Sequence, residues 1–339
     1  MHALVTGGGG FLGGYIIEAL VARGDRVRSF GRGDYPQLRE QGVEVIRGDI
    51  RDRNAVAAAC KGIDCVFHTA AITGLSSTAR AHTEFVTTNT WGTRQVILGC
   101  RAHRVPRLVF TSSPSAVFSG QDQAGVDESV RYNFDWLFQH GASYSVTKAT
   151  AEFSVLRSNG RGFLRTCALR PHLIWGPGDT HLIPRLIARA KSGRLRRIGD
   201  GTNLVDITYV ENAAEAHLLA ADALARTDSP VGGKTYFISQ GEPVNCWQWI
   251  DEVLALADLP AVKRSMSFKT AWRIGAACEA AYRLLRINRE PPMTRFLAAQ
   301  LATSHWFDIS AARRDLGYRP RVPTAEGMQR LGKWLSQTS

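Results

Sequence analysis

Short apolar runs alternate with longer amphipathic segments over the first half of the chain, which predicts strands joined by helices. After the first run, Leu12, Ile16 and Leu20 lie on one helical face, and Gly24 is suited to end that helix. The predicted strands cover residues 2–7, 26–31, 43–49, 65–71, 107–113 and 165–171. Because strands that alternate with helices form a parallel sheet covered on both faces, we predict an α/β, doubly wound fold.

The pattern becomes less regular beyond residue 172, where prolines and glycines interrupt a short basic helix. A strand and a helix are predicted in residues 203–224, and another strand in residues 234–240. Asn245 is placed to cap a further helix. Residues 308–335 predict two short helices around a turn. This second part of the chain therefore indicates a smaller, mostly helical lobe.

Composition narrows the range of partners. Lysine and arginine outnumber the acidic residues by 42 to 30, and the resulting charge of +12 favours anionic groups such as phosphate or carboxylate. Basic and aromatic residues are not interleaved as in a platform that stacks bases, so we do not expect nucleic-acid binding.

The chain begins MHALVTGGGG, without the basic and apolar regions of a secretory signal, so we expect a cytosolic protein. Its six cysteines lack C-x-x-C spacing and several lie in apolar runs, which predicts buried free thiols and no metal site. No apolar run reaches the roughly 20 residues that a membrane span requires.

A glycine-rich loop, TGGGGFLGG, follows the first predicted strand and opens the first predicted helix. Gly7 permits a tight turn, Gly10 lets the backbone approach a pyrophosphate, and Gly13 lets helix and strand pack closely. The free N–H groups at the start of the helix, at Phe11 and Leu12, are placed to hold phosphates. This context predicts a dinucleotide-binding, Rossmann-type domain, and the alternative is an unusually glycine-rich turn.

The end of the second strand bears on which dinucleotide binds, because a carboxylate there would hold the ribose of NAD. It reads VRSFGRGD, and Arg32 follows the position where an acid is expected. A guanidinium suits a 2′-phosphate, so we favour NADP(H) over NAD(H). An exposed Arg32 with Asp34 at the ribose is the alternative. Further cofactor contacts are predicted at the ends of the later strands, at Asp49, Ile50, Ala70, Ala71, Ser112, Pro171 and His172.

In the segment SYSVTKATAE, Tyr144 and Lys148 lie one helical turn apart on the same face. An ammonium close to a phenol favours its ionised form, and such a tyrosine can exchange a proton with a substrate oxygen near neutral pH. Ser113, at the end of the fifth predicted strand, is placed to hold the same oxygen. We therefore predict Ser113, Tyr144 and Lys148 as the catalytic residues.

These motifs together resemble the extended short-chain dehydrogenase/reductase superfamily, whose pattern combines T-G-x-x-G-x-x-G, a serine after the fifth strand and Y-x-x-x-K. The resemblance covers nearly the whole chain, including RPHLIWGPGD and the tail form DLGYRP. It implies that Ser113, Tyr144 and Lys148 are catalytic, and that Tyr144 and Lys148 also contact the cofactor, Lys148 at the nicotinamide ribose. It further implies that Asn89, in NTWGT, has a structural more than a chemical role.

Within the superfamily, the segment from RPHLIWGPGD onwards resembles the 3β-hydroxysteroid dehydrogenase-like branch. The segments SFGRGDYPQL, SMSFKTAWRIGAACE and PPMTRFLAAQLATSHWF are similar to the 2-alkyl-3-oxoalkanoate reductases of bacterial long-chain olefin biosynthesis. That family reduces the 3-keto group of a two-tailed β-keto acid with NADPH. The resemblance therefore implies this reaction and a lipid-like keto or hydroxy acid as the small-molecule partner.

The domain boundaries follow from the motifs and the change of pattern. We expect a dinucleotide-binding domain of residues 1–172, completed by about 203–238, and a substrate-binding lobe of residues 173–202 and 239–339.

A two-tailed acid needs an apolar groove and a cationic group for its carboxylate. The candidate groove walls, which core packing explains as well, are Trp175, Trp272, Tyr282, Phe296 and Trp306. His172 and Arg185 are the candidates for the carboxylate, with hydrogen bonds to the cofactor or between lobes as the alternative. We expect the amphipathic segment 270–287 to form a lid over lipid tails, in preference to touching a membrane surface.

Two other functions stay open. One is a 3β-hydroxysteroid or decarboxylating sterol-4α-carboxylate 3-dehydrogenase, which a preference for NAD would favour. The other is a non-catalytic NADP sensor, against which the presence of all three catalytic residues argues. Association with other enzymes of the same pathway or as a homo-oligomer is compatible with the sequence.

Overall fold

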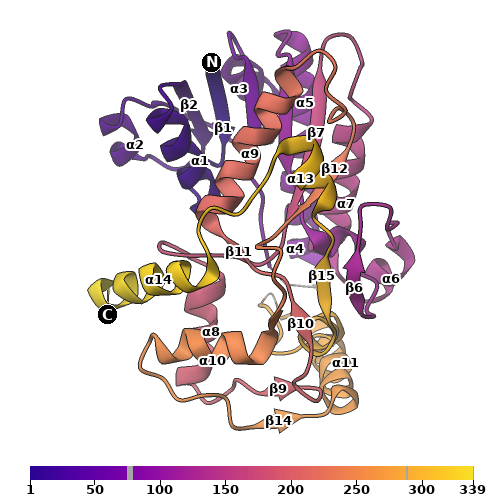
Figure 1. The fold of residues 1–339 in the computed structure, drawn as a ribbon. Coiled ribbons are helices and arrows are strands. Elements are labelled where there is room, and N and C mark those ends of the chain that lie inside the picture. Colours follow the sequence, from indigo (N-terminus) through magenta and orange to yellow (C-terminus); the bar gives the residue numbers. More distant parts are fainter. Residues whose placement is uncertain (75–78, 288, 339) are drawn as a thin grey trace.

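A seven-stranded sheet organises the larger part of the molecule (Figure 1). The computed structural model describes residues 1–74, 79–287 and 289–338. The strands of the sheet are, in chain order, β1 (His2–Thr6), β2 (Arg26–Gly31), β3 (Glu44–Arg47), β4 (Cys65–His68), β5 (Arg107–Thr111), β7 (Arg165–Pro171) and β12 (Thr235–Ile238). In space they are ordered β3-β2-β1-β4-β5-β7-β12, and every neighbouring pair is parallel. The order reverses between β1 and β4, where an open sheet leaves a crevice beyond the carboxyl ends of its strands.

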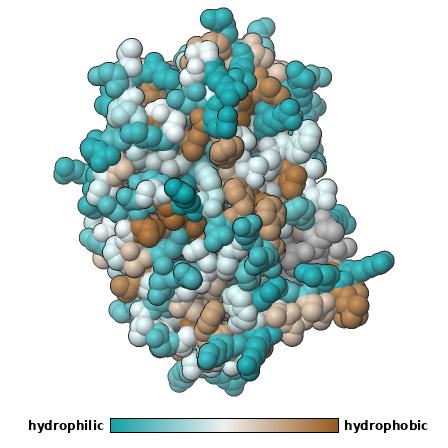
Figure 2. Space-filling model, turned by 90° about the vertical axis from the view of Figure 1, so that its right-hand side faces the viewer, coloured by the Kyte–Doolittle hydropathy of each residue, from teal (hydrophilic) through white to brown (hydrophobic). Residues whose placement is uncertain are grey.

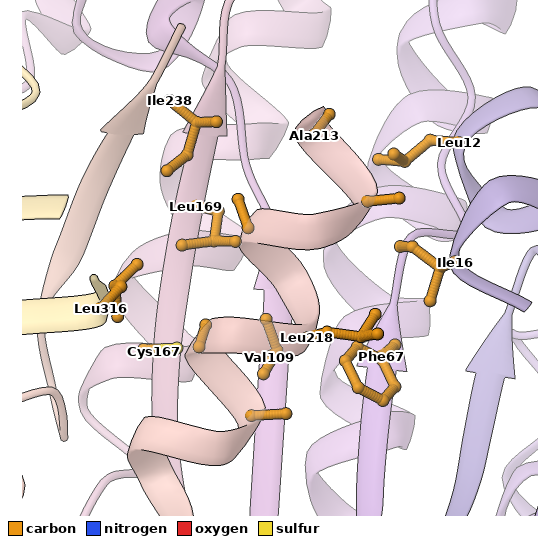
Figure 3. Close-up of a cluster of buried hydrophobic side chains, with 14 of the residues drawn as sticks. Leu12, Ile16, Phe67, Val109, Cys167, Leu169, Ala213, Leu218, Ile238 and Leu316 are labelled. Carbon is orange, nitrogen blue, oxygen red and sulfur yellow. The ribbon is translucent and has the colours of Figure 1, made fainter. Parts of the chain in front are cut away.

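Helices cover both faces of this sheet, as predicted for a doubly wound fold (Figure 1). On one face α1 (Phe11–Ala22) packs against α9 (Val210–Ala225), and on the other α5 (Gly92–Ala102) packs against α3 (Arg53–Ala59) and α7 (Ser143–Leu156). Alternate side chains of each strand serve the two faces, so Val109 lies in the cluster under α1 and α9, and Phe110 lies in the opposite one. Figure 3 shows the first cluster.

The smaller lobe occupies the lower part of Figure 1. Its elements are β8 (Ile174–Trp175), α8 (Leu182–Lys191), β9 (Arg197–Ile198), β10 (Leu204–Val205), β11 (Thr208–Tyr209), β13 (Val244–Asn245), α10 (Cys246–Ala255), β14 (Ser265–Met266), α11 (Phe268–Leu284), α12 (Arg295–Ala302), β15 (His305–Phe307) and α14 (Thr324–Thr338). The side chain of Asn245 accepts the backbone N–H groups of Trp247 and Gln248, and so caps α10 as predicted.

Short elements complete the two lobes: α2 (Pro36–Glu40), α4 (Ala79–Phe85), the π-helix η1 (Val86–Trp91), the 3-10 helix η2 (Pro114–Val117), β6 (Gln123–Val126), α6 (Phe134–Gln139) and α13 (Ser310–Leu316).

The division between the lobes differs from the expected boundaries in three places. Helix α13 packs on α9 and β12 of the sheet domain, and its Leu316 lies in the cluster drawn in Figure 3. Strand β6 falls within residues 1–172 but pairs with β15 of the smaller lobe. Strand β10 falls within residues 203–238 but pairs with β13 and β15 of the same lobe. Strands of two to four residues carry too little pattern to indicate their partners, so these assignments depend on tertiary contacts.

The prediction of free thiols is confirmed for all six cysteines, of which five are buried and Cys278 is half-buried. Burial raises the pKa of the Cys65 thiol to about 12, which leaves it unreactive near neutral pH. Among the helices described here, none is both long and apolar enough to span a bilayer.

Candidate active site

A cleft of about 930 Å³ lies beyond the carboxyl ends of the sheet strands. It is closed on one side by the segment that leaves β7 and by the start of α8. The predicted site residues that line it are Gly7, Gly10, Phe11, Leu12, Gly13, Arg32, Asp49, Ile50, Ala70, Ala71, Ser112, Ser113, Tyr144, Lys148 and Pro171. The structure therefore brings together the three predicted catalytic residues and every predicted cofactor residue except His172.

The glycine loop has the close contacts that its spacing predicts. Gly7 has a φ of +76°, and a Cβ there would lie 2.9 Å from Cα of Ala70. A Cβ on Gly13 would lie 2.2 Å from the carbonyl oxygen of Gly7, so a side chain fits at neither position. Gly10 precedes α1, and no side chain caps the first turn of that helix. Its backbone N–H groups and positive dipole end therefore face the cleft and suit the diphosphate of a dinucleotide.

Arg32 and Asp34 have different surroundings at the end of β2. Arg32 lines the cleft, whereas Asp34 does not and forms an ion pair with Arg39. Tyr35, which our sequence reasoning missed, lies against the glycine loop, because a Cβ on Gly9 would be 2.0 Å from its ring. The clue in the sequence was Gly9, the third of four consecutive glycines, which leaves room for this ring. The cleft therefore presents a cation and an aromatic ring at this end.

Asp49, at the end of β3, lines the cleft with its charge already compensated. Its carboxylate accepts the backbone N–H of Arg51 and the Nε–H of the Arg51 side chain, each at 2.9 Å. The hydrogen bonding from the Arg51 side chain is the largest cause that lowers the pKa of Asp49, and the backbone hydrogen bond adds to it. The carboxylate therefore stays ionised and paired.

Ser113, Tyr144 and Lys148 meet at the inner end of the cleft. Ser113 follows β5, and its hydroxyl accepts the backbone N–H of Ser115 at 3.2 Å, which fixes it at the start of η2. Tyr144 lies in the first turn of α7, where its ring contacts Phe85 at 6.4 Å between centroids. The neighbouring Ser112 hydroxyl is buried and has no hydrogen-bond partner among the described residues, so a polar group of a ligand could pair with it.

The charge states of the tyrosine and the lysine differ from the expectation. Burial raises the pKa of Tyr144 to about 12, and the nearby Ser113 hydroxyl opposes this in part. Burial lowers the pKa of Lys148 to about 7, against the charge of Glu152. The Lys148 ammonium donates a hydrogen bond to the carbonyl of Thr111 and lies 4.3 Å from the centroid of the Phe110 ring. The expectation that Lys148 depresses the tyrosine pKa is therefore wrong in this structure, because burial dominates and the ammonium is held elsewhere.

Asn89 has the structural position that the resemblance implied. It is buried within η1, and its amide accepts the backbone N–H of Ile72 at 2.8 Å and donates to the carbonyl of Ile72 at 3.0 Å. It also donates to the hydroxyl of Thr147 at 3.1 Å. Asn89 therefore ties the loop after β4 to the helix that carries Tyr144.

His172 and Arg185 lie outside the cleft. The two ring nitrogens of His172 contact the carbonyl of Asp206 and, at 3.0 Å, Nδ1 of His305. Burial, followed by the His305 contact, lowers the pKa of His172 to about 3, so the ring is neutral and cannot serve as a cation for a carboxylate. Arg185 forms an ion pair of 2.6 Å with Glu290. The placement of His172 among the cofactor residues is corrected accordingly: it forms the interlobe hydrogen bonds that were the alternative.

The five aromatic residues proposed as groove walls do not line the cleft, namely Trp175, Trp272, Tyr282, Phe296 and Trp306. Trp175 is fully buried and packs edge-on against Tyr209 and Trp249, and Phe296 packs against Phe118. Core packing therefore explains these two. Apolar side chains that do line the cleft include Ile72, Leu173, Ile174 and Leu182.

Asp179 also lines the cleft, and our sequence reasoning missed it. Its buried carboxylate accepts the backbone N–H groups of His181 at 2.7 Å and Ile183 at 2.9 Å, and so holds the start of α8. This fixes His181 and Leu182 against the cleft. An aspartate within a few residues of the start of a helical pattern is a recognised signal, because it can accept the free N–H groups there, so the sequence contained the clue.

Comparison with known proteins agrees with this arrangement. The sequence model of the 3-beta hydroxysteroid dehydrogenase/isomerase family matches residues 4–268. The chain is 49% identical to a 2-alkyl-3-oxoalkanoate reductase of Stenotrophomonas maltophilia, over 98% of both chains. It is 43% identical to a protein of the same name from Shewanella oneidensis, over 97% of this chain and 85% of that one.

Among solved structures, one described as MoeE5 in complex with UDP-glucose and NAD has a TM-score of 0.74 and 25% identity, and covers 100% of this chain and 99% of that one. The structural neighbour and the sequence relatives agree with the cleft in indicating a nicotinamide dinucleotide as cofactor. The chain is an NAD(P)-dependent oxidoreductase and belongs to the 3-beta hydroxysteroid dehydrogenase/isomerase family.

Proposed function

We propose that the protein reduces the 3-keto group of a 2-alkyl-3-oxoalkanoate to the 3-hydroxy acid with NADPH, in the biosynthesis of long-chain olefins. The observation that carries the proposal is the meeting of Ser113, Tyr144 and Lys148 in one cleft with the glycine loop. The substrate class is supported by the names of the two bacterial relatives, which match nearly the full length of the chain.

The side chains suit the direction of reduction. A phenol with a pKa of about 12 remains protonated near neutral pH, so Tyr144 is ready to donate its proton to the keto oxygen. The Ser113 hydroxyl would donate a second hydrogen bond to that oxygen and favour the negative charge that develops there. Lys148 would donate a hydrogen bond to the nicotinamide ribose. A bound NADPH would supply the hydride that adds to C3.

The apolar part of the cleft lining suits alkyl chains more than it suits a sugar. The side chains of Ile72, Leu173, Ile174 and Leu182 carry no hydrogen-bonding groups for sugar hydroxyls. A sterol would find the same apolar surface, and the family description supports this second candidate.

An assay in the oxidative direction separates the two candidates. Purified protein would be given a racemic 2-alkyl-3-hydroxyalkanoate or a 4α-carboxysterol, each with NADP⁺ and with NAD⁺. We expect NADP⁺-dependent oxidation of the hydroxy acid, recorded by absorbance of the reduced nucleotide. Oxidation of the sterol with NAD⁺ and none of the hydroxy acid would contradict the proposal.

The preference for NADPH is proposed to depend on Arg32. Its guanidinium lines the cleft at the adenosine end, so Arg32→Ser should remove the charge-assisted hydrogen bonds to the 2′-phosphate. A loss of about 1.5–3 kcal/mol would weaken NADPH binding roughly tenfold to a hundredfold and leave NADH binding nearly unchanged. Fluorescence titration of each nucleotide measures both dissociation constants.

Asp34→Asn is the matched control for this pair of measurements. Asp34 lies outside the cleft and pairs with Arg39, so neither nucleotide should bind differently to this variant. The alternative predicts the opposite result: Asp34→Asn would bind NADH more weakly, and Arg32→Ser would bind NADPH as well as the unmodified protein does. That result would place Asp34 at the ribose.

A further inference from the structure

Helix α11 is fixed in the second lobe by one of its faces. Ala271, Gly275 and Glu279, each four residues apart, are its buried residues. A Cβ on Gly275 would lie 2.6 Å from the backbone nitrogen of Arg295, so the start of α12 touches the α11 backbone directly. The carboxylate of Glu279 accepts Nε–H of Arg295 at 2.8 Å. These contacts determine which side of α11 faces outward.

The outward side of α11 is apolar as well. Ile274, Ala277, Ala281 and Leu284 follow one another at intervals of three and four residues, and therefore form a stripe opposite the buried face. All four are exposed, Leu284 to 83%, and Leu285 beside the stripe is exposed to 66%. The stripe runs over eleven residues, from Ile274 to Leu284, or about 15 Å of helix. Nothing in the described part of the chain covers these leucines.

The exposed charged residues of α11 and of the turn just after it all have the same sign. Lys269, Arg273, Arg283 and Arg286 are exposed along α11 and just beyond its end. The one acidic residue of the helix, Glu279, is buried against Arg295. Figure 2 views the side of the molecule where α11 lies in Figure 1, and it shows hydrophobic and hydrophilic residues interleaved over this lower part. The outward side of α11 is thus both apolar and cationic.

We propose that α11 docks this protein on the surface of an anionic lipid bilayer. The apolar stripe would enter the boundary between head groups and acyl chains, and the four cations would meet lipid phosphates. A helix with an exposed apolar stripe, exposed cations and no exposed acid has the features of an interfacial helix. This inference is independent of the substrate, because no residue of α11 lines the cleft. For the same reason the expected lid over lipid tails does not describe this helix.

A second copy of the chain fits the outward side of α11 less well. The spacing of the stripe resembles that of a helix pair, but pairing α11 with itself would bring its four cations close to those of the partner. No exposed acid on α11 is available to compensate them, since Glu279 is buried. Charge complementarity therefore favours an anionic surface over self-association.

Vesicle co-sedimentation with the full chain tests the proposal. Vesicles of phosphatidylcholine mixed with phosphatidylglycerol should bind the protein at least about tenfold more strongly than phosphatidylcholine alone, and added salt should weaken the binding. The double variants Leu284→Ser/Leu285→Ser and Arg273→Glu/Arg283→Glu should each bind the anionic vesicles about tenfold less. Both variants lie outside the cleft, so unchanged turnover of a soluble substrate shows that they are folded.

Leu204→Ser/Arg101→Glu is the matched control, because it removes an exposed leucine and reverses an exposed arginine away from α11. It should bind vesicles as the unmodified protein does. Equal binding to neutral and anionic vesicles, absent binding, or binding that both α11 variants retain would overturn the proposal. A dimer in size-exclusion chromatography that only Leu284→Ser/Leu285→Ser dissociates, with vesicle binding intact, would assign the stripe to a second copy instead.

Discussion

Replacing Tyr144 with phenylalanine should lower the turnover number for keto-acid reduction by about a thousandfold while leaving NADPH binding nearly unchanged. The variant keeps the ring and its contact with Phe85 but loses the phenolic proton that lies beside the Ser113 hydroxyl. A positioned proton donor contributes typically 10²–10⁴ in rate, so the chemical step is the one affected. Steady-state kinetics and nucleotide fluorescence separate the two effects.

Tyr282→Phe provides the comparison for this result. Tyr282 lies on α11, outside the cleft, so the loss of its hydroxyl should leave turnover unchanged. If Tyr144→Phe were as active as Tyr282→Phe, the assignment of the proton donor would be wrong. If Tyr144→Phe lost nucleotide binding together with turnover, the tyrosine would act in holding the cofactor and not in the proton transfer.

Removing the carboxylate of Glu152 should cost about 3–5 kcal/mol in the free energy of unfolding. Glu152 lies one turn after Lys148 in α7, and its side chain is completely buried. Its oxygens accept Nε–H of Arg170, at 3.0 Å, a second N–H of the same guanidinium, and the hydroxyl of Tyr132. In Glu152→Ala the guanidinium of Arg170, itself only 3% exposed, would remain buried without its anion.

Urea unfolding measures this loss, and a double variant controls for the cavity. In Glu152→Met/Arg170→Met neither charge is left unpaired, so it should recover a large part of the lost stability. Removing the exposed ion pair Arg80–Glu84 offers a second comparison. It should change the free energy of unfolding by no more than about 1 kcal/mol. Stability of Glu152→Ala within that smaller range would show that the buried pair contributes little.

The position of Glu152 connects stability to the site. Tyr144, Lys148 and Glu152 follow at intervals of four residues along one face of α7, so the ion pair with Arg170 anchors the helix to β7 directly behind the lysine. Glu152 is also the charge that raises the pKa of Lys148 against burial. The sequence showed the interval, but the partner of Glu152 lies 18 residues away and became visible only in the structure.

The local parts of the site could be predicted because their causes are local. The strand of residues 165–171 and the helix after Asn245 follow from patterns within a few residues, and both are confirmed. The requirement for glycine at positions 7 and 13 follows from contacts inside one strand-loop-helix unit. The resemblance of the motifs also predicted the protein family, and the comparisons confirm it.

The sequence by itself determined the doubly wound sheet, the glycine loop and the residues that end in one cleft, because strand periodicity and the crevice at the carboxyl ends of parallel strands follow from it. Only the tertiary structure decided what each buried polar group contacts. His172 forms a hydrogen bond with His305, which is 133 residues away. Lys148 donates its hydrogen bond to the carbonyl of Thr111 and does not lower the pKa of Tyr144. Such partners come from packing between distant segments, and neither hydrophobic period nor motif spacing encodes which donor meets which acceptor.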